Sequence, residues 1–179
     1  MEQSKKELFI THLFDAPREL VFEAWTNAEQ LKHWYAPDGC TIEFKHINVI
    51  EGGTFHSCIQ DPIHGNCWIK GTYQEVIFPE KLVFSMILTN EQGESVESIA
   101  AGKPEDWPKE TITTVTFTPI GNQTKLAIHQ TVSEEDAKQT GAYQSWIKMF
   151  NKLNNLFTVK SKSHFMQLFH PNISTITEL

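Results

Sequence analysis

Between residues 41 and 132 the chain consists of short segments rich in β-branched and aromatic residues, separated by Gly, Pro, Asn and Asp. In several of them apolar and polar side chains alternate, as in a strand with one buried face. Six strands are predicted there and one before them, at 7–14, 41–47, 54–60, 66–77, 80–89, 111–119 and 124–132. Thr-rich outward positions are typical of an antiparallel sheet with one face in water. Such a sheet has to bury its other face against another layer.

Helical patterns supply that layer at both ends of the strand region. The segment 15–26 places Pro17 at a first helical position, and 27–35 begins at Asn27, a good N-cap. The segment 133–157 predicts the longest helix, with an apolar stripe of residues three or four apart: Tyr143, Trp146, Ile147, Phe150, Leu153 and Phe157.

Two features modify this last helix. Gly141 weakens its first half by about 1 kcal/mol relative to Ala, so we expect a bend there. Residues 164–169 are expected to form a short helical turn that packs back on the body, ended by Pro171.

The resulting order of elements is β-α-α-β6-α, which is typical of the α+β class. We expect a curved antiparallel sheet wrapped around the long C-terminal helix, with a hollow where the curved sheet and the straight helix part. The length of 179 residues fits one domain, 1–179. Its core is expected at about 7–157, with an acidic insert at 91–110 and a C-terminal extension at 158–179.

The amino-acid composition limits which classes of binding partner are expected. The net charge is −7, and Arg18 is the only arginine, whereas proteins that read nucleic acid rely on arginine. Nucleic acid is therefore not an expected partner. No apolar run reaches the ~20 residues that span a bilayer, so no membrane insertion is expected. The first ten residues lack the apolar region of a signal peptide, and three cysteines are expected as free thiols, which together predict a cytoplasmic protein.

Cysteine and histidine positions give a weak metal pattern. Cys58, Cys67 and His56 could converge on one hairpin face, but a closed zinc site needs four ligands, and no metal is expected. A two-residue loop at Pro62 and Ile63 would set Cys58 opposite Cys67, whereas a longer loop would break that register.

Two titratable residues could carry chemistry. By strand alternation His46 shares a face with Ile42 and Phe44, so it either points into the hollow or lies at the sheet end, satisfied by backbone or water. Glu75 either serves as a base in a dry pocket, or pairs with a Lys or caps a turn, and Arg18 is a further candidate partner.

The aromatic load is large, with five Trp and twelve Phe residues. Inward positions on the strands and the last helix give these candidates for lining a ligand cavity: Phe44, His46, Phe84, Met86, Phe117, Tyr143, Trp146 and Phe150. The same residues could instead fill a solid core, and the sequence leaves both alternatives open. Trp107 in the acidic insert is expected either as a lid or partner anchor, or folded on its own loop.

Several short sequence elements, each present once, follow one another along residues 7–157. They are Ala16-Pro17 before Val21, Phe22, Ala24 and Trp25; Leu31, Trp34, Tyr35 and Pro37; Gly52-Gly53-x-Phe55; Asp61-Pro62 with Gly65; Gly71-x-Tyr73-x-Glu75; Pro79-Glu80-x-Leu82-Val83-Phe84; and Trp146. Together they resemble the family of homologues of the activator of the 90-kDa heat-shock protein ATPase, within the START-like (SRPBCC) superfamily. The resemblance implies a helix-grip fold, START-like or Bet v-like, with a hydrophobic cavity. The chain departs from the family pattern at Ser145, where Gly is common, and in the acidic insert and tail.

These features favour non-catalytic binding of a small hydrophobic or amphipathic ligand between sheet and helix, without a cofactor, by a monomer or homodimer. One alternative is a chaperone-associated or stress-response interaction module, which the family name implies. A second is a small polyketide-cyclase-like enzyme, which requires that His46 or Glu75 point into the hollow.

Overall fold

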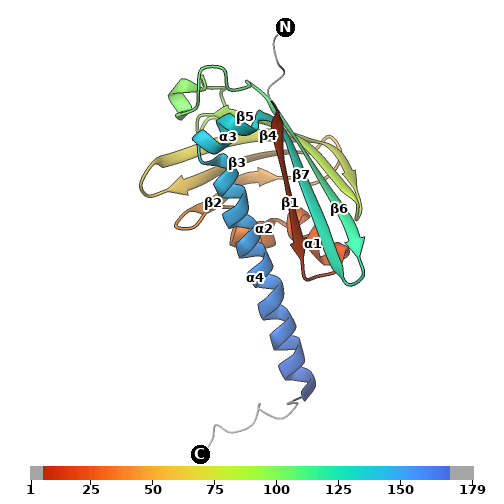
Figure 1. Cartoon of the computed structure of the whole chain (residues 1–179). Helices are drawn as coiled ribbons and strands as arrows, with labels where there is room; N and C mark the ends of the chain where they lie inside the picture. Colours follow the sequence, from red (N-terminus) through yellow and green to blue (C-terminus); the bar gives the residue numbers. More distant parts are fainter. Residues whose placement is uncertain (1–5, 170–179) are drawn as a thin grey trace, which may run out of the picture.

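The computed structural model describes residues 6–169, with side chains up to Thr158, and its main feature is one curved antiparallel sheet (Figure 1). The sheet has seven strands in the order β1-β7-β6-β5-β4-β3-β2. The strands are β1 (Glu7–Phe14), β2 (Thr41–Ile47), β3 (Thr54–Asp61), β4 (Gly65–Ile77), β5 (Lys81–Thr89), β6 (Thr111–Ile120) and β7 (Gln123–Ser133). All seven predicted strands are confirmed to within a few residues at each end.

The helices cover the concave side of this sheet. They are α1 (Arg18–Thr26), α2 (Ala28–Trp34), α3 (Glu134–Gln139) and α4 (Ala142–Phe169), with a short 3-10 helix, η1 (Ile99–Ala101), in the loop between β5 and β6. α1 and α2 lie at one end of the concave side, and α4 crosses it (Figure 1). The predicted α+β helix-grip architecture is therefore confirmed.

The joint between α3 and α4 is a break rather than a bend. Gly141 has φ of 76°, in the left-handed region that ends a helix, and α4 starts one residue later. At its other end α4 continues to Phe169, because no Gly or Pro interrupts it after Gly141. The prediction that residues 164–169 form a separate turn packing back on the body is wrong, since they continue α4 away from the sheet (Figure 1). Pro171 lies outside the described residues.

A single apolar core lies between the inner face of the sheet and the helices. From the helices it includes Trp25 of α1, Trp34 of α2 and Phe150 of α4, each at most 2% exposed. The predicted stripe of α4 is mostly confirmed, because Trp146, Leu153 and Phe157 are also buried, whereas Tyr143 and Ile147 are half-buried at the edge. Met149 is buried as well, although the stripe did not predict it. Each large apolar side chain buried this way contributes roughly 1.5–3 kcal/mol relative to its exposed state.

Two irregularities in the sheet change which face side chains take. The pairing of β2 with β3 shifts between Phe44 and His46, and that of β4 with β5 shifts between Tyr73 and Glu75. A bulge adds one residue to a strand, so the alternation of faces is reset after it. Gly71 lies just before the second shift, and a Cβ there would come within 1.8 Å of the Ser85 carbonyl oxygen. The backbone of β5 at Ser85 is therefore too close to position 71 for any residue with a Cβ.

The hairpin between β3 and β4 has the longer of the two loops considered from the sequence. Asp61 pairs with Gly65, which leaves three residues in the loop. Cys58 therefore lies opposite Trp68, and Cys67 lies opposite Ile59. Because the side chains of Cys58 and Cys67 leave opposite faces of the sheet, the two thiols do not converge.

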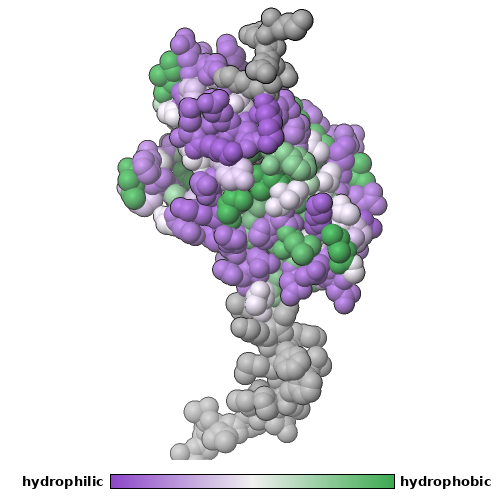
Figure 2. Space-filling model, in the orientation of Figure 1, coloured by the Kyte–Doolittle hydropathy of each residue, from purple (hydrophilic) through white to green (hydrophobic). Residues whose placement is uncertain are grey.

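The face shown in Figure 2 is largely hydrophilic, and its apolar side chains form separate groups rather than one broad patch. Among the described residues, no helix is long and apolar enough to cross a membrane.

Candidate ligand-binding site

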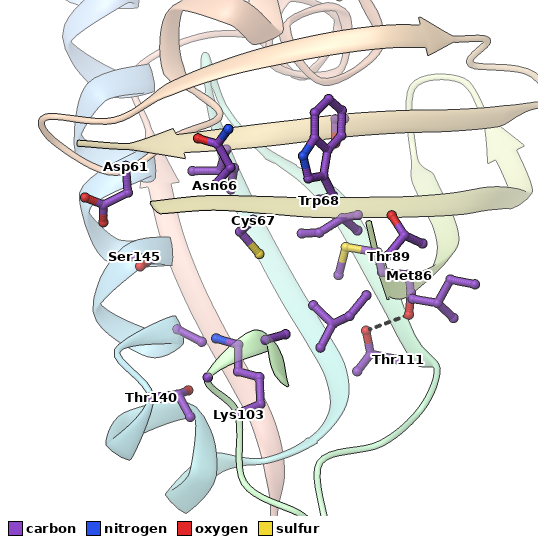
Figure 3. A pocket seen from close by; sticks show the side chains of 18 of the residues that line it. Asp61, Asn66, Cys67, Trp68, Met86, Thr89, Lys103, Thr111, Thr140 and Ser145 are labelled. Atoms are coloured by element: carbon purple, nitrogen blue, oxygen red, sulfur yellow. Dashed lines mark hydrogen bonds between the residues drawn. The ribbon is translucent and has the colours of Figure 1, made fainter. Parts of the chain in front are cut away.

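A pocket of about 1050 Å³ opens at one end of the space between the sheet and α4. Its walls are formed by β3, β4 and β5, by the loop between β5 and β6 that carries η1, and by the first turns of α4 (Figure 3). A volume of this size is at the upper end of pockets that hold drug-sized ligands. The curvature of the sheet keeps its end away from α4, and side chains do not fill the gap.

The pocket has a largely apolar interior. Side chains from the sheet and from α4 form it: Ile42, Phe55, Ile69, Met86, Leu88, Trp146 and Met149. Of the eight side chains predicted to line a cavity, Met86 and Trp146 do so. That either contacts a ligand stays a prediction.

Polar groups in this interior are bonded to one another. The indole Nε1 of Trp146 donates to Oε1 of Gln130 at 3.0 Å, and Nε2 of Gln130 donates to the hydroxyl of Thr113 at 2.9 Å. These bonds fix the ring of Trp146 at the pocket wall. Burial raises the pKa of the Tyr35 hydroxyl at the same wall, so this group stays neutral near physiological pH.

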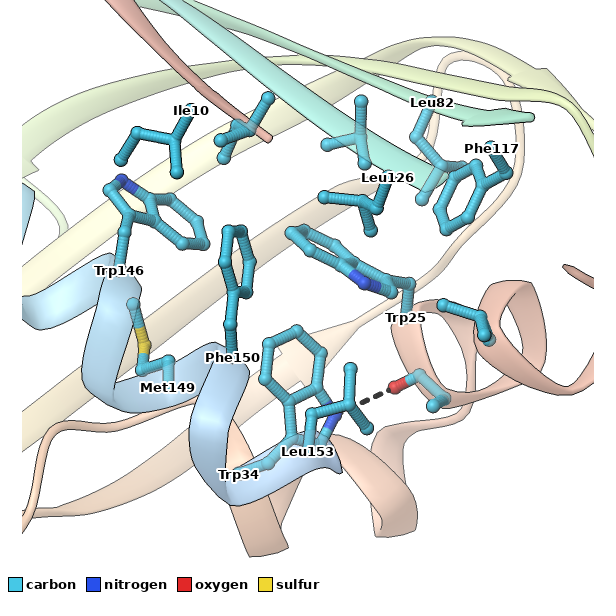
Figure 4. Packing of buried hydrophobic residues seen from close by; sticks show 14 of the residues in the cluster. Ile10, Trp25, Trp34, Leu82, Phe117, Leu126, Trp146, Met149, Phe150 and Leu153 are labelled. Atoms are coloured by element: carbon cyan, nitrogen blue, oxygen red, sulfur yellow. Dashed lines mark hydrogen bonds between the residues drawn. The ribbon is translucent and has the colours of Figure 1, made fainter. Parts of the chain in front are cut away.

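The centre of the grip, in contrast, is solid. Trp25 and Trp146 are stacked with centroids 6.0 Å apart and planes 16° apart, and Phe150 packs beside both (Figure 4). The predicted cavity residues Phe84, Phe117 and Phe150 are buried in this core and do not line the pocket. Phe44 and Tyr143 are half-buried and pack against the edge of the core, also outside the pocket.

His46 does not point into the pocket. The shift in pairing after Phe44 turns His46 to the outer face, where its ring lies 6.4 Å from that of His56 and its Nε2 is 3.1 Å from the hydroxyl of Thr54. The face shared with Ile42 and Phe44, expected from simple alternation, is therefore wrong, and of the two alternatives for His46 the inward one is contradicted, since the side chain is exposed.

Glu75 also points away from the pocket. The shift after Tyr73 places Glu75 on the face opposite Val76, which packs on the core. Its carboxylate accepts a hydrogen bond from Nζ of Lys81 at 2.9 Å. The alternative of a Glu paired with a Lys is confirmed, with Lys81 as the partner, whereas Arg18 pairs with Glu80 at 3.7 Å.

The rim of the pocket carries a fixed negative charge. Hydrogen bonds from the ring of His64 and from the backbone N–H groups of Ile63 and His64 lower the pKa of Asp61 to about 2. Burial raises the pKa of the neighbouring Cys40 thiol, and the Asp61 carboxylate raises it further. Cys40 is therefore a neutral thiol at the rim.

The acidic insert forms the wall opposite β4. Trp107 lines the pocket and packs against the core, while its carbonyl oxygen accepts a hydrogen bond from the hydroxyl of Ser98 at 3.2 Å. It is thus both folded on its own loop and part of the pocket. Sequence reasoning missed three residues that line the pocket: Lys103 of the insert, Cys67 of β4 and Thr140 at the end of α3. For Lys103 the reason is that no pattern in the sequence shows that the insert folds back over β4.

The described residues contain no cluster of metal-binding side chains. Within residues 6–158, no group of three or more His, Cys, Asp or Glu side chains is placed to hold a metal ion. All three cysteines are free, and Cys58 is buried.

Comparison with known proteins places the fold in a described family. The family model named Activator of Hsp90 ATPase homolog 1-like protein matches residues 15–158. No curated protein matched the chain.

Solved structures with this fold come from several bacteria. A Staphylococcus epidermidis protein superposes with a TM-score of 0.72 at 21% identity, covering 89% of this chain and 93% of its own. A Mycobacterium smegmatis protein gives 0.72 at 16% identity, covering 88% and 98%. The AHSA1 protein from Silicibacter pomeroyi gives 0.67 at 14% identity, covering 87% and 99%. At these identities the likeness extends to the fold and no further.

Proposed function

The chain belongs to the Activator of Hsp90 ATPase homolog 1-like protein family, and on that premise we propose that it binds a small hydrophobic or amphipathic molecule without transforming it. The observation that carries the proposal is the pocket of about 1050 Å³ beside a solid aromatic core. An apolar interior gains free energy when it exchanges water for an apolar ligand.

The non-catalytic part of the proposal is supported by the positions of the titratable residues. His46 and Glu75, the two candidates for acid–base chemistry, lie on the outer face of the sheet with partners of their own. Their positions therefore argue against a polyketide-cyclase-like mechanism that uses either of them. The free thiols support placing this binding activity in the cytoplasm.

Ser145 offers a sharp test, because its side chain enters the pocket from the first turn of α4 (Figure 3). We expect Ser145→Phe to fill part of the pocket and to weaken binding of a hydrophobic ligand by about tenfold or more, since buried apolar contact is lost. Gln144→Phe is the matched control, because Gln144 is on the exposed side of the same turn. Native mass spectrometry and thermal shift against a panel of lipids and metabolites give the readout.

The result that would contradict the proposal is a panel with no ligand for the wild-type chain. Equal binding by Ser145→Phe and Gln144→Phe would show that a ligand binds elsewhere.

A second candidate function, a chaperone-associated module, rests on the family name alone. Its test is a pull-down with the 90-kDa heat-shock ATPase of the same cell, together with a measurement of ATP hydrolysis with and without this protein. Retention and a raised rate would support it, and the absence of both would dismiss it.

A further inference from the structure

Lys103 brings a positive charge to the pocket wall. It follows η1 and Gly102, whose φ of 71° reverses the chain, and its backbone N–H donates to the Ser98 carbonyl at 2.9 Å. The half-buried side chain reaches from the insert toward Cys67 on β4 (Figure 3).

The insert holds this ammonium group in place. Nζ of Lys103 lies 5.1 Å from the centroid of the Trp107 ring, a cation–π contact. Trp107 is itself packed against the core, as described above. The charge is therefore positioned before any ligand arrives, which lowers the entropy cost of binding.

No carboxylate among the described residues pairs with Lys103. The two acidic residues that line the same pocket have other partners, since Asp61 bonds to His64 and Glu91 lies 3.6 Å from Nζ of Lys45. Burial raises the pKa of the Cys67 thiol, and the charge of Lys103 offsets part of that rise. The field of Lys103 thus reaches across the pocket to β4.

We propose that the pocket selects single-chain amphiphiles with an anionic head group, which Lys103 pairs while the chain lies along Met86, Leu88 and Trp146. This inference rests on the proposed function and adds the charge of the ligand to it. One cation matches a carboxylate or another head of low charge. A cationic head would be repelled, and an uncharged alcohol would gain only the apolar contact.

Three ligands with the same chain test the inference: decanoate, decanol and decyltrimethylammonium, titrated calorimetrically into the full chain at low ionic strength. We expect decanoate to bind about tenfold more tightly than decanol, since the pair is only partly shielded from water. Decyltrimethylammonium should bind most weakly. Added salt should weaken the binding of decanoate and leave the binding of decanol unchanged.

Substitutions at Lys103 test whether this residue causes the preference for an anionic head group. The variants Lys103→Met and Lys103→Gln should lose the preference for decanoate and keep the wild-type affinity for decanol. Lys103→Glu should shift the preference to decyltrimethylammonium. Lys109→Met is the matched control, because Lys109 lies in the same insert, is exposed and does not line the pocket. It should behave as the wild-type chain does.

Two outcomes would overturn the inference, and they differ. Equal affinity for decanoate and decanol in the wild-type chain, or an unchanged preference in both neutral Lys103 variants, refutes charge selection and leaves ligand binding intact. Failure of all three amphiphiles to bind refutes the proposed function together with the inference.

Discussion

Trp25 and Trp34 lie side by side in the core and differ in one hydrogen bond. Their ring centroids are 4.9 Å apart, and both rings are almost fully buried. Nε1 of Trp34 donates to the Ala24 carbonyl at 3.0 Å, whereas Nε1 of Trp25 has no partner among the described residues. The Ala24 carbonyl is in the last turn of α1, where the helix itself offers no donor. The indole of Trp34 therefore caps a free carbonyl at the C-terminal end of α1.

This difference predicts unequal costs for the same substitution. Trp34→Phe leaves a buried carbonyl without its donor, whereas Trp25→Phe removes a donor that was already unpaired. We expect Trp34→Phe to lower the free energy of unfolding by about 1–3 kcal/mol more than Trp25→Phe. Chemical denaturation of both variants measures it, and equal costs would show that the Trp34 bond contributes nothing.

Some of the residues that line the pocket could be predicted from the sequence, and others could not. Met86 and Trp146 were predicted because strand and helix periodicity identify inward positions correctly. Strand alternation placed His46 on the face of Ile42 and Phe44 and left its inward orientation open, because a bulge leaves no signal in the residue pattern and one extra residue reverses the face. Lys103 could not be predicted, since its position depends on how the insert folds in three dimensions.

Among the elements, the joint at Gly141 reverses an expectation drawn from helix propensity. Within a continuous helix Ala would be better than Gly by about 1 kcal/mol. At φ of 76°, however, a Cβ strains the backbone, although no neighbouring atom would contact it.

We therefore expect Gly141→Ala to lower the free energy of unfolding by about 1–2 kcal/mol. Gly141→Asn should lose less, because Asn tolerates the left-handed region. Thermal denaturation followed by circular dichroism compares them. Higher stability of Gly141→Ala would mean that α3 and α4 form one helix in solution.

Element order was predictable, and element ends were less so. The strands and the long helix follow from apolar periodicity, which the burial of their inner faces enforces. The length of α4 was underestimated because its apolar stripe ends at Phe157, whereas the backbone stays helical without a breaker up to Phe169. Whether the hollow is filled depends on how neighbouring aromatic rings pack, and the central rings do fill it.

The pH dependence of the protein's overall stability should come in part from two histidines. His12 of β1 faces inward, with its ring 5.6 Å from that of Phe150 on α4, and burial lowers its pKa. Burial also lowers the pKa of His56, which lies under the turn at Gly93. An unfolded chain binds protons more readily at both positions, so these groups favour the folded state above the unfolded pKa of 6.5.

The free energy of unfolding should therefore fall as the pH is lowered from about 7.5 to about 5.5. Replacing His12 or His56 by Gln should each remove part of this slope. Denaturant titrations across that pH range make the measurement, with the exposed His33→Gln as the matched control. A slope that both replacements leave unchanged would contradict the prediction.

The loop that completes the pocket joins β5 to β6, and these strands are neighbours in the sheet. A tight turn could connect them without altering the strand order, so this loop is dispensable for the architecture. The strand order and the proposed head-group selectivity therefore depend on separate stretches of chain. Lineages or designers could exchange one without rebuilding the other, and a transplanted segment 91–110 should carry its preference to another grip of the same curvature.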